Sequence, residues 1–402
     1  MSLYNRGLSE SLIRPLAQTP ILSVVIPTSN RPVELALTVS SIADQIDSAL
    51  EGKVEIIISD NCSGPETRAV LVQLSETYPS VSYYIHDWNY GGMYQVAVAP
   101  YRARGRWTWV FGDDDALGPG GLKAVLDVLE TEQPTFLTIN RQVWNKTLDQ
   151  CVTETRHDLP DTRFATFIDL LGVFGFDQLS FFASQVYDTE AARAVDMEPY
   201  KDSMCRYAQL AYYLEAFHDR PSYYLSAPVV WHRWDQDAAA VHTLNFHSLA
   251  TSLPELVQAA ADRVGLEPGL FEKISGRRSL LGPETRPATF VDNILQNLWR
   301  CVAAGVPISD SEWAVLHQLS PQWRTGRAEG LQQVHEAYAN IAVAFEHYQA
   351  LVANHQACTS PGQTYSPEEI GLLQQSEAAI QSLQGNINDA RKMAFDISAG
   401  FG

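Results

Sequence analysis

Three consecutive carboxylates, Asp113, Asp114 and Asp115, stand one residue beyond the apolar run 107–111. We expect that run to be a β-strand, and ligands of open α/β sheets bind outside the carboxyl ends of the strands. Neighbouring carboxylates repel one another and lose hydration at such an edge, so the site needs a compensating charge. A hard divalent cation supplies one, because it takes oxygen ligands from one or two carboxylates and the rest from water and a diphosphate. The triplet thus predicts metal-assisted phosphate chemistry, with a solvated acidic turn before the helix expected at Pro119 as the alternative.

Polar or small residues also follow three other runs that are typical of strands, at 22–26, 54–59 and 81–85. Parallel strands bring their carboxyl ends to one edge of a sheet, so all of these residues are expected on the edge that carries the triplet. A carboxylate there can bind the hydrogen-bond donors of a nucleobase, and a glycine pair lets the backbone approach phosphates closely. The residues concerned are Pro27, Thr28, Asn30 and Arg31 after the first run, Asp60 after the second, and Asn89 and Gly91 after the third.

Segments with helical spacing separate these runs. One begins at Pro32 and repeats apolar residues on one face as far as Leu50, another begins at Pro119, and a fifth strand is expected at 136–139. Continuous apolar strands that alternate with amphipathic helices predict an α/β fold with a mainly parallel sheet covered on both faces.

Beyond residue 150 the pattern changes. Residues 178–182 and 222–225 are predicted as short strands and 203–217 as a helix, and almost everything after residue 238 is predicted to be helical. Two long helices are expected at 328–355 and 367–394. We expect them to pack as a hairpin, with a homo-oligomer interface or a docking surface as the alternative.

The composition limits the partners of the chain. It has 402 residues, with 28 Lys and Arg against 47 Asp and Glu, and a formal net charge of −19. Such a surface repels phosphate backbones, which argues against nucleic-acid binding and requires that a phosphate-bearing substrate be held locally. The 5 cysteines have no metal-site or disulfide spacing. Because neither an apolar run of about 20 residues nor a signal-peptide pattern is present, we expect a cytoplasmic protein without a transmembrane segment, compatible with work at the inner membrane face.

The segments SVVIPTSNR, EIIISDNCS, NYGG and ARGRWTWVFGDDDAL occur in this order along the chain. Their succession resembles the nucleotide-binding half of the family 2 glycosyltransferases, which have the GT-A fold. The resemblance covers residues 20–130, and the strings SDN and GDDD resemble the branch that contains abequosyltransferases. It implies a nucleotide-sugar-binding half at 21–140 and an acceptor-binding half at 141–237. Residues 1–20 are expected to be an N-terminal extension, and the helical pattern, not the resemblance, predicts a separate domain at 238–402.

The resemblance also implies roles for individual residues. Pro27, Thr28, Asn30 and Arg31 would line the nucleotide pocket, Asp60 would contact the base, and Asn89 and Gly91 would lie near the ribose and diphosphate. Asp115 would be the direct ligand of Mn²⁺ or Mg²⁺, with Asp113 on the sugar, the ribose or the metal, and Asp114 beside them. His232, in VWHRW, would be a late metal or diphosphate contact, and the alternative is a histidine packed between tryptophans.

A catalytic base is implied at a helix start well beyond the acidic motif. Asp202, in YKDS, is the candidate, although Lys201 stands where the family usually has a second acid. The alternative is that Asp202 only caps the helix that follows. Asp177, before the strand predicted at 178–182, is the reserve candidate.

The activity implied by the resemblance is an inverting, hexosyltransferase-type reaction (EC 2.4). One sugar would pass from a UDP- or GDP-type donor to a hydroxyl of a glycan or lipid-linked acceptor, in surface polysaccharide or glycan synthesis. The chain has no Q-x-x-R-W string, which implies a non-processive enzyme. Two alternatives remain: a sugar-phosphate nucleotidyltransferase, whose Gly-rich loop is not found after the first strand, and a degenerate transferase that acts as a binding or scaffold protein.

Overall fold

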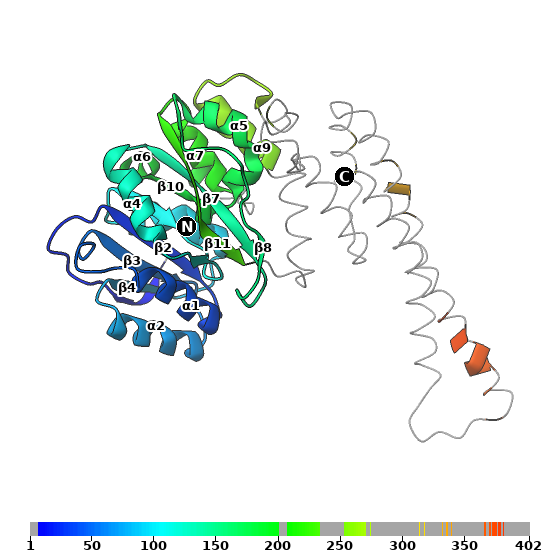
Figure 1. Ribbon diagram of the computed structural model, residues 1–402. Helices are drawn as coiled ribbons and strands as arrows, with labels where there is room; N and C mark the ends of the chain where they lie inside the picture. The colour runs from blue at the N-terminus through cyan, green and yellow to red at the C-terminus, as the bar shows by residue number, and fades with distance from the viewer. Residues whose placement is uncertain are drawn as a thin grey trace. The chain divides into compact units, whose positions relative to one another are not determined.

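The computed structural model describes residues 7–200, 207–233 and 253–270, together with scattered single positions beyond residue 273. The chain divides into two compact units, one of Met1–Asp237 with Ser252–Pro287 and the other of Ala238–Thr251 with Ala288–Gly402. The helices and strands below all belong to the first unit (Figure 1). Within the described ranges, no helix is both long and apolar enough to cross a membrane.

Four neighbouring strands form the first half of the sheet. They are β4 (Val81–His86), β3 (Val54–Asp60), β2 (Leu22–Thr28) and β5 (Trp107–Val110), and all run parallel. Almost every residue in them is buried, because helices cover both faces. This double burial explains the continuous apolar runs of the sequence. The four strands predicted here are confirmed.

An antiparallel strand, β10 (Gln185–Asp188), joins this half to the rest of the sheet. It lies between β5 and β7 (Phe136–Trp144) and is antiparallel to both, so β5 and β7 run in the same direction. β11 (Ser222–Arg233) is parallel to β7. The carboxyl ends of β2, β3, β4, β5, β7 and β11 therefore share one edge, which confirms the predicted mainly parallel sheet.

Short antiparallel strands complete the sheet at its margins. They are β1 (Leu8–Leu12), β6 (Ala116–Leu117), β8 (Cys151–Thr153) and β9 (Thr162–Phe164). The order is β1-β4-β3-β2-β5-β10-β7-β11-β6, with β8 on β7 and β9 on β11.

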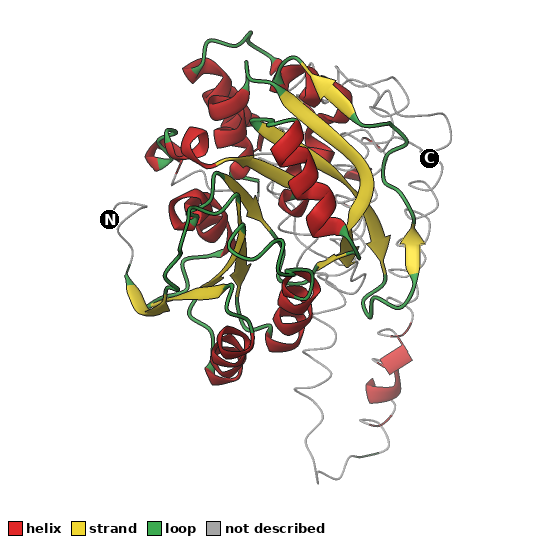
Figure 2. Ribbon diagram, turned by 60° about the vertical axis from the view of Figure 1, so that its left-hand side comes forward, coloured by secondary structure: helices red, strands yellow, loops and turns green. Residues whose placement is uncertain are grey.

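Helices cover both faces of the sheet (Figure 2). α1 (Pro32–Ala43), α2 (Pro65–Thr77) and α4 (Gly121–Thr131) line one apolar core, whereas α3 (Gly92–Arg102) packs with α6 (Thr189–Arg193) and α7 (Gln209–Phe217). The other helical segments are α5 (Phe167–Ser180), α9 (Leu253–Arg263) and two 3₁₀ turns at Phe182–Ser184 and Glu198–Tyr200. α9 packs against α7, where Arg263 Nε donates to Glu215 Oε1 at 2.8 Å. This α/β architecture confirms the predicted fold class.

The strand predicted at 178–182 is wrong. These residues form the end of α5 and the turn after it. α5 begins at a capping box in which Thr166 and Asp169 satisfy each other's backbone N–H groups. Periodicity alone does not separate a short apolar run at a helix end from a strand. A kink at Gly175, where φ is 67°, also interrupts the helical period.

The predicted helix boundaries shift by a few residues or more. The helix expected from Pro119 begins at Gly121, and α1 ends at Ala43 rather than near Leu50. The helix expected at 203–217 begins at Gln209, after a turn at residues 207–208, and residues 201–206 lie outside the described ranges. Most of the two long C-terminal helices predicted at 328–355 and 367–394 also lies outside them, and the four-part domain division stays a prediction.

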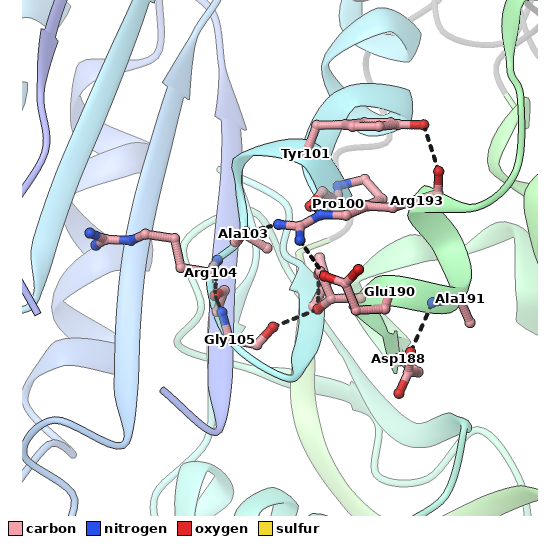
Figure 3. A network of polar contacts seen from close by, with 12 residues as sticks. Pro100, Tyr101, Ala103, Arg104, Gly105, Asp188, Glu190, Ala191 and Arg193 are labelled. Atoms are coloured by element: carbon pink, nitrogen blue, oxygen red, sulfur yellow. Dashed lines mark hydrogen bonds and ion pairs between the residues drawn. The ribbon is translucent and has the colours of Figure 1, made fainter. Parts of the chain in front are cut away.

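One arginine fastens the second half of the sheet to the first (Figure 3). Arg193, the last residue of α6, donates to the carbonyl oxygen of Pro100 at 2.8 Å and to that of Ala103, at the carboxyl end of α3. The last carbonyls of a helix lack donors within the helix and carry partial negative charge. Tyr101 Oη donates in return to the Arg193 carbonyl at 3.1 Å, and Glu190 pairs with the guanidinium. Because β5 follows α3 closely, this contact fixes where the strand enters the sheet.

We expect Arg193→Ala to lower the free energy of unfolding by about 2 kcal/mol, because two helix-end carbonyls lose a charged donor. Urea titration followed by circular dichroism measures this change. Lys123→Ala is the control, since the Lys123 side chain is 70% exposed and its ammonium pairs with Asp127 on the surface of α4. This substitution should lower the free energy of unfolding by less than about 0.5 kcal/mol. Equal losses in the two variants would contradict the role given to Arg193.

Candidate functional site

The path of the chain across the sheet reverses between β2 and β5. From β2 it proceeds outward through β3 to β4, and it then returns to β5 on the other side of β2. At such a switch point a crevice opens outside the carboxyl ends of the two strands, and ligands bind there. Pro27 and Thr28 end β2, and Asp113 stands just beyond β5. The topology therefore brings two of the predicted segments to one crevice.

The acidic triplet is tied to the end of β2. Thr28 Oγ1 donates to Asp113 Oδ2 at 2.8 Å. Arg31 Nη1 donates to Asp113 Oδ1 and to Asp114 Oδ2, at 2.8 Å in both cases. The polar residues after the first predicted strand thus contact the carboxylates after the fourth, as the sequence predicted for this edge.

Asp115 is held from two further elements. It is 3% exposed, and the backbone N–H of Arg233, at the end of β11, donates to its Oδ1 at 3.2 Å. Thr38, on α1, directs its hydroxyl to the carbonyl oxygens of Asp113 at 2.9 Å and Asp115 at 2.6 Å. A Cβ at Gly112 would lie 2.6 Å from Asp115 Oδ2, so a side chain there would displace the Asp115 carboxylate. The turn is therefore fixed through its backbone as well as its carboxylates.

Burial raises the pKa of the two buried carboxyls of the triplet, those of Asp113 and Asp115. It raises the pKa of Asp113 to about 6, and the neighbouring Arg31 charge opposes the rise. Burial, followed by the Asp114 charge, raises the pKa of Asp115 well above its ordinary value, whereas the Arg141 charge lowers it. Arginines therefore supply part of the compensating charge that the sequence pattern alone assigned to a metal ion.

Arg141 is a site residue that the sequence analysis missed. It is 5% exposed, its Nη1 donates to Gln178 Oε1, and its guanidinium lies 4.5 Å from the centre of the Phe181 ring. Gln178 in turn donates to the carbonyl oxygen of Ile139 at 3.0 Å, which anchors the pair to β7. In the sequence, Arg141 stands two residues beyond the strand predicted at 136–139, and only the structure shows that it is buried within β7. A buried charge of that kind needs a partner, and Asp115 lies within its electrostatic reach.

The triplet fits an open type of metal site. Among the residues that the structure describes, no three His, Cys, Asp or Glu side chains are grouped to enclose a metal ion. A hard cation that shares a diphosphate needs one or two carboxylates and completes its shell with water. The side chain of Asp114 is 43% exposed, and buried Asp113 and Asp115 adjoin it in the chain. These carboxylates suit a cation that arrives with a phosphate ligand.

His232 lies against an aromatic ring. Its imidazole packs on Phe181, with ring centroids 4.5 Å apart. This is the packed-aromatic environment named as the alternative, although the partner is a phenylalanine rather than a tryptophan. The role of His232 as a metal or diphosphate contact stays a prediction.

Asp60 occupies the end of β3 and is fully buried. Its Oδ2 accepts the backbone N–H of Ser63 at 3.0 Å. Its Oδ1 is buried and has no hydrogen-bond partner in the described part of the chain. Burial raises the pKa of this carboxyl, and the hydrogen bonds from Ser63 oppose the rise. An acceptor oxygen therefore stands at the predicted base-binding position.

Asn30 links the loops after β2 and β3. It has a positive φ of 54°, which asparagine tolerates better than most residues. Its backbone N–H donates to Ser63 Oγ at 2.9 Å, and its Oδ1 accepts the N–H of Gly64 at 2.8 Å. Asn30 therefore uses its backbone N–H and its side-chain oxygen to hold the loop next to Asp60.

The loop that carries Asn89 and Gly91 is attached to β3 by amide side chains. Asn61 Nδ2 donates to Asn89 Oδ1 at 2.7 Å, and the Gly91 N–H donates to the same oxygen at 3.0 Å. Gly91 has a φ of 87° and precedes the first turn of α3. A Cβ built on Gly91 or Gly92 would meet no described atom within 4 Å. This backbone thus borders open space at the predicted phosphate side of the site.

Arg233 contributes a side chain as well as a backbone group. Its Nε and Nη2 are buried and, as far as the described ranges extend, have no hydrogen-bond partner. A buried guanidinium without acceptors is costly. An anionic ligand next to Asp115 would provide them.

The two base candidates are placed only in part. Asp202 lies outside the described residues. Asp177 lies near the carboxyl end of α5, not before a strand, and its side chain is not described. Both assignments stay predictions.

Residues 23–187 match the family model described as Glycosyl transferase family 2. An uncharacterized glycosyltransferase from Haemophilus influenzae is 30% identical over 110 residues, which cover 27% of this chain and 35% of that protein. Abequosyltransferase RfbV from Salmonella typhimurium is 30% identical over 118 residues, covering 29% and 35%. The chain therefore spans about a third of the length of these curated relatives.

Two solved structures show low overall similarity. The crystal structure of TarS from S. aureus has 13% sequence identity and a TM-score of 0.48, over 78% of this chain and 52% of that one. Mannosyltransferase PcManGT from Pyrobaculum calidifontis, in complex with GDP-Man and Mn²⁺, has 14% identity and a TM-score of 0.43, over 85% and 91%.

We expect Thr38→Val to lower the free energy of unfolding by about 1–3 kcal/mol, because two buried carbonyl oxygens lose a shared donor. The substitution should also weaken the binding of any ligand that depends on the position of the acidic turn. Urea titration measures the first effect. Thr38→Ser, which keeps the hydroxyl, is the control and should retain most of the stability; a loss as large as that of valine would show that the methyl group, not the hydrogen bonds, matters.

His86, at the end of β4, gives a pH-dependent prediction. Burial, and then the Arg102 charge, lower the pKa of this histidine to about 4, against an ordinary value of 6.5. The unfolded chain therefore binds the proton more readily between these values, so the contribution to stability is complete above pH 6.5 and is lost as the pH falls to 4.

We expect the wild type to lose up to about 3 kcal/mol more than His86→Gln between pH 7 and pH 4. Unfolding by urea at both pH values measures the difference between the two proteins in their loss of stability. The titration of the other groups contributes equally to both proteins and therefore cancels. Parallel pH profiles for the two proteins would show that His86 titrates normally.

Proposed function

We propose that this protein is a glycosyltransferase that moves one sugar from a nucleotide diphosphate to an acceptor hydroxyl. The proposal starts from the match of residues 23–187 to the model of glycosyl transferase family 2. The observation that carries the proposal is the contact of Thr28 and Arg31 with Asp113. It joins the end of the first strand to the acidic motif at the switch point of the sheet, where α/β proteins bind nucleotides.

The donor nucleotide is assigned to the crevice between Asp60 and the acidic triplet. Oδ1 of Asp60, which has no partner among the described residues, would accept a hydrogen bond from a base N–H, as in uracil or guanine. The open backbone at Gly91, with Asn89 beside it, supports a ribose or phosphate contact there. The buried donors of Arg233, together with Arg31, support a place for the diphosphate near Asp115. Pro27, Thr28 and Asn30 would form the wall of this pocket.

A divalent cation, Mn²⁺ or Mg²⁺, would be held by Asp115 with Asp113 or Asp114 and would neutralise charge on the departing diphosphate. The open character of the triplet supports this assignment. The acidic surface adds a reason, because a molecule of net charge −19 has to bind an anionic donor through local cations.

The chemistry proposed is a single displacement with inversion. The acceptor oxygen attacks the anomeric carbon from the side opposite the diphosphate, the bond from that carbon to the diphosphate oxygen breaks, and the nucleotide diphosphate leaves with the electron pair. The hydroxyl proton passes to a carboxylate base, a step that typically contributes about 10²–10⁴-fold. Asp202 is the proposed base, with Asp177 in reserve.

The acceptor is proposed to be a glycan or lipid-linked saccharide, in surface polysaccharide synthesis, with one sugar added per encounter. The similarity to an abequosyltransferase over 118 residues supports the transfer of a sugar. The sugar itself is set by contacts in the second half of the domain, which resemblance at the level of a fold does not supply.

Asp115→Asn tests the proposal. We expect it to remove Mn²⁺-dependent thermal stabilisation by UDP or GDP and to lower sugar-nucleotide hydrolysis at least about 100-fold, because the charge that meets the cation is gone. Its own melting temperature should not fall, since burial raises the pKa of this carboxyl and a neutral amide of the same shape suits the position. Differential scanning fluorimetry and a coupled hydrolysis assay provide both measurements.

Asp127→Asn, which removes an acid that is 55% exposed on α4, is the control and should behave as the wild type. Stabilisation by nucleotide that does not require metal would contradict the metal dependence alone. If no nucleotide diphosphate stabilises the wild type under any condition, the glycosyltransferase proposal fails.

A further inference from the structure

The Arg31 guanidinium holds two of the three carboxylates at once. A single nitrogen, Nη1, lies 2.8 Å from Asp113 Oδ1 and 2.8 Å from Asp114 Oδ2. The Arg31 and Asp114 side chains are 48% and 43% exposed, whereas that of Asp113 is 9% exposed. The contact therefore sits at the boundary between the buried part of the triplet and solvent, where an incoming ligand would meet it.

The backbone on which Arg31 is mounted is fixed on both sides. Asn30, before it, is bonded to the Ser63 and Gly64 segment through its N–H and its side chain. Pro32, after it, is the first residue of α1 and has a restricted φ. Movement is thus confined to the long side chain, which can change partner without disturbing the strand ends.

The buried carboxylates keep other partners without Arg31. Asp113 Oδ2 accepts from Thr28, and Asp115 Oδ1 accepts from the backbone of Arg233. The turn is also held by the Thr38 hydroxyl. Arg31 is therefore the half-exposed and exchangeable member among the groups that hold the triplet.

A metal ion held by Asp115 with Asp113 or Asp114 would share a carboxylate with the Arg31 guanidinium. Two cations on one carboxylate repel each other, so a metal ion that binds there alone competes with Arg31. A diphosphate changes this balance, because its oxygens are good acceptors for a guanidinium. With the nucleotide present, the displaced arginine gains a new partner beside the old one.

We propose that Arg31 exchanges between the Asp113–Asp114 pair and the diphosphate of the donor, and thereby couples the binding of the divalent cation to the binding of the nucleotide. This inference rests on the proposed function of the site. Arg31 is a counter-ion of the acidic pair in the free protein and a ligand of the substrate in the complex. Coupling is reciprocal, so the nucleotide raises the affinity for the cation by the same factor as the cation raises that for the nucleotide.

Arg31→Gln tests the exchange in a binding experiment. Free Mn²⁺ is measured by electron paramagnetic resonance during titration of the protein, alone and with saturating UDP or GDP. We expect the variant to bind Mn²⁺ alone about fivefold more tightly than the wild type, because a competing charge is gone. We expect the nucleotide to raise the Mn²⁺ affinity by a smaller factor in the variant than in the wild type.

Two further variants make the comparison specific. Arg31→Lys keeps the charge and should retain weak binding of Mn²⁺ alone. Arg106→Gln makes the same substitution at an exposed arginine next to the first residue of β5, at the opposite edge of the sheet, and should leave every Mn²⁺ affinity unchanged. Thermal unfolding of each protein verifies that it is folded.

The outcomes separate the two levels of inference. If Arg31→Gln leaves both the Mn²⁺ affinity and the nucleotide effect at wild-type values, the exchange is overturned and the metal-dependent transferase stands. If the nucleotide does not raise the Mn²⁺ affinity of the wild type, the exchange is also overturned. If Mn²⁺ binds none of the proteins, with or without nucleotide, the exchange and the proposed metal dependence fall together.

Discussion

The burial of carboxylates at the edge of an apolar sheet is the constraint on which the rest of this structure depends. A carboxylate that loses hydration without new partners is very costly, and three in succession repel one another as well. Separate elements meet this cost. A hydroxyl comes from β2, a guanidinium from the residue before α1, and a backbone N–H from β11. The acidic turn is therefore stable only when the sheet around it is complete.

The position of β10 makes this assembly possible. Because β10 is antiparallel to both of its neighbours, β5 and β7 run the same way, and β11 follows β7 in parallel. Arg233, 118 positions after Asp115, thereby reaches the edge where the triplet stands. The contact of Arg193 with the end of α3 secures the same junction from the helical layer (Figure 3). Part of the site, Arg141 and Arg233, thus comes from the second part of the domain, beyond the strands that carry the recognisable motifs.

The sequence predicts those parts of the structure in which a single physical requirement determines the residue types. Strands buried on both faces must be apolar throughout, so β2 to β5 were visible, and the residues after them had to share an edge. The end of α5 is predicted wrongly as a strand because a short run of apolar and aromatic residues is compatible with either a strand or a helix end. Arg141 was missed for a different reason. Arg141 matters because its charge acts on Asp115, which is distant from it in the sequence. A local sequence pattern does not indicate such a long-range interaction.

A net charge of −19 disfavours an anionic donor over the molecule as a whole, and the placement of the arginines offsets this at the site. Arg31 and Arg141 both lower the pKa of carboxyls in the triplet, and Arg233 has buried guanidinium nitrogens near the end of β11. Arg141 and two nitrogens of Arg233 are buried, where screening by water is weak. Most of the acids in the described part of the chain are instead exposed or half-buried, where their effect is screened over about 10 Å. The local field at the crevice therefore differs from the average over the molecule. An acidic protein can bind a diphosphate at such an edge, provided that its own carboxylates are neutralised before the ligand arrives.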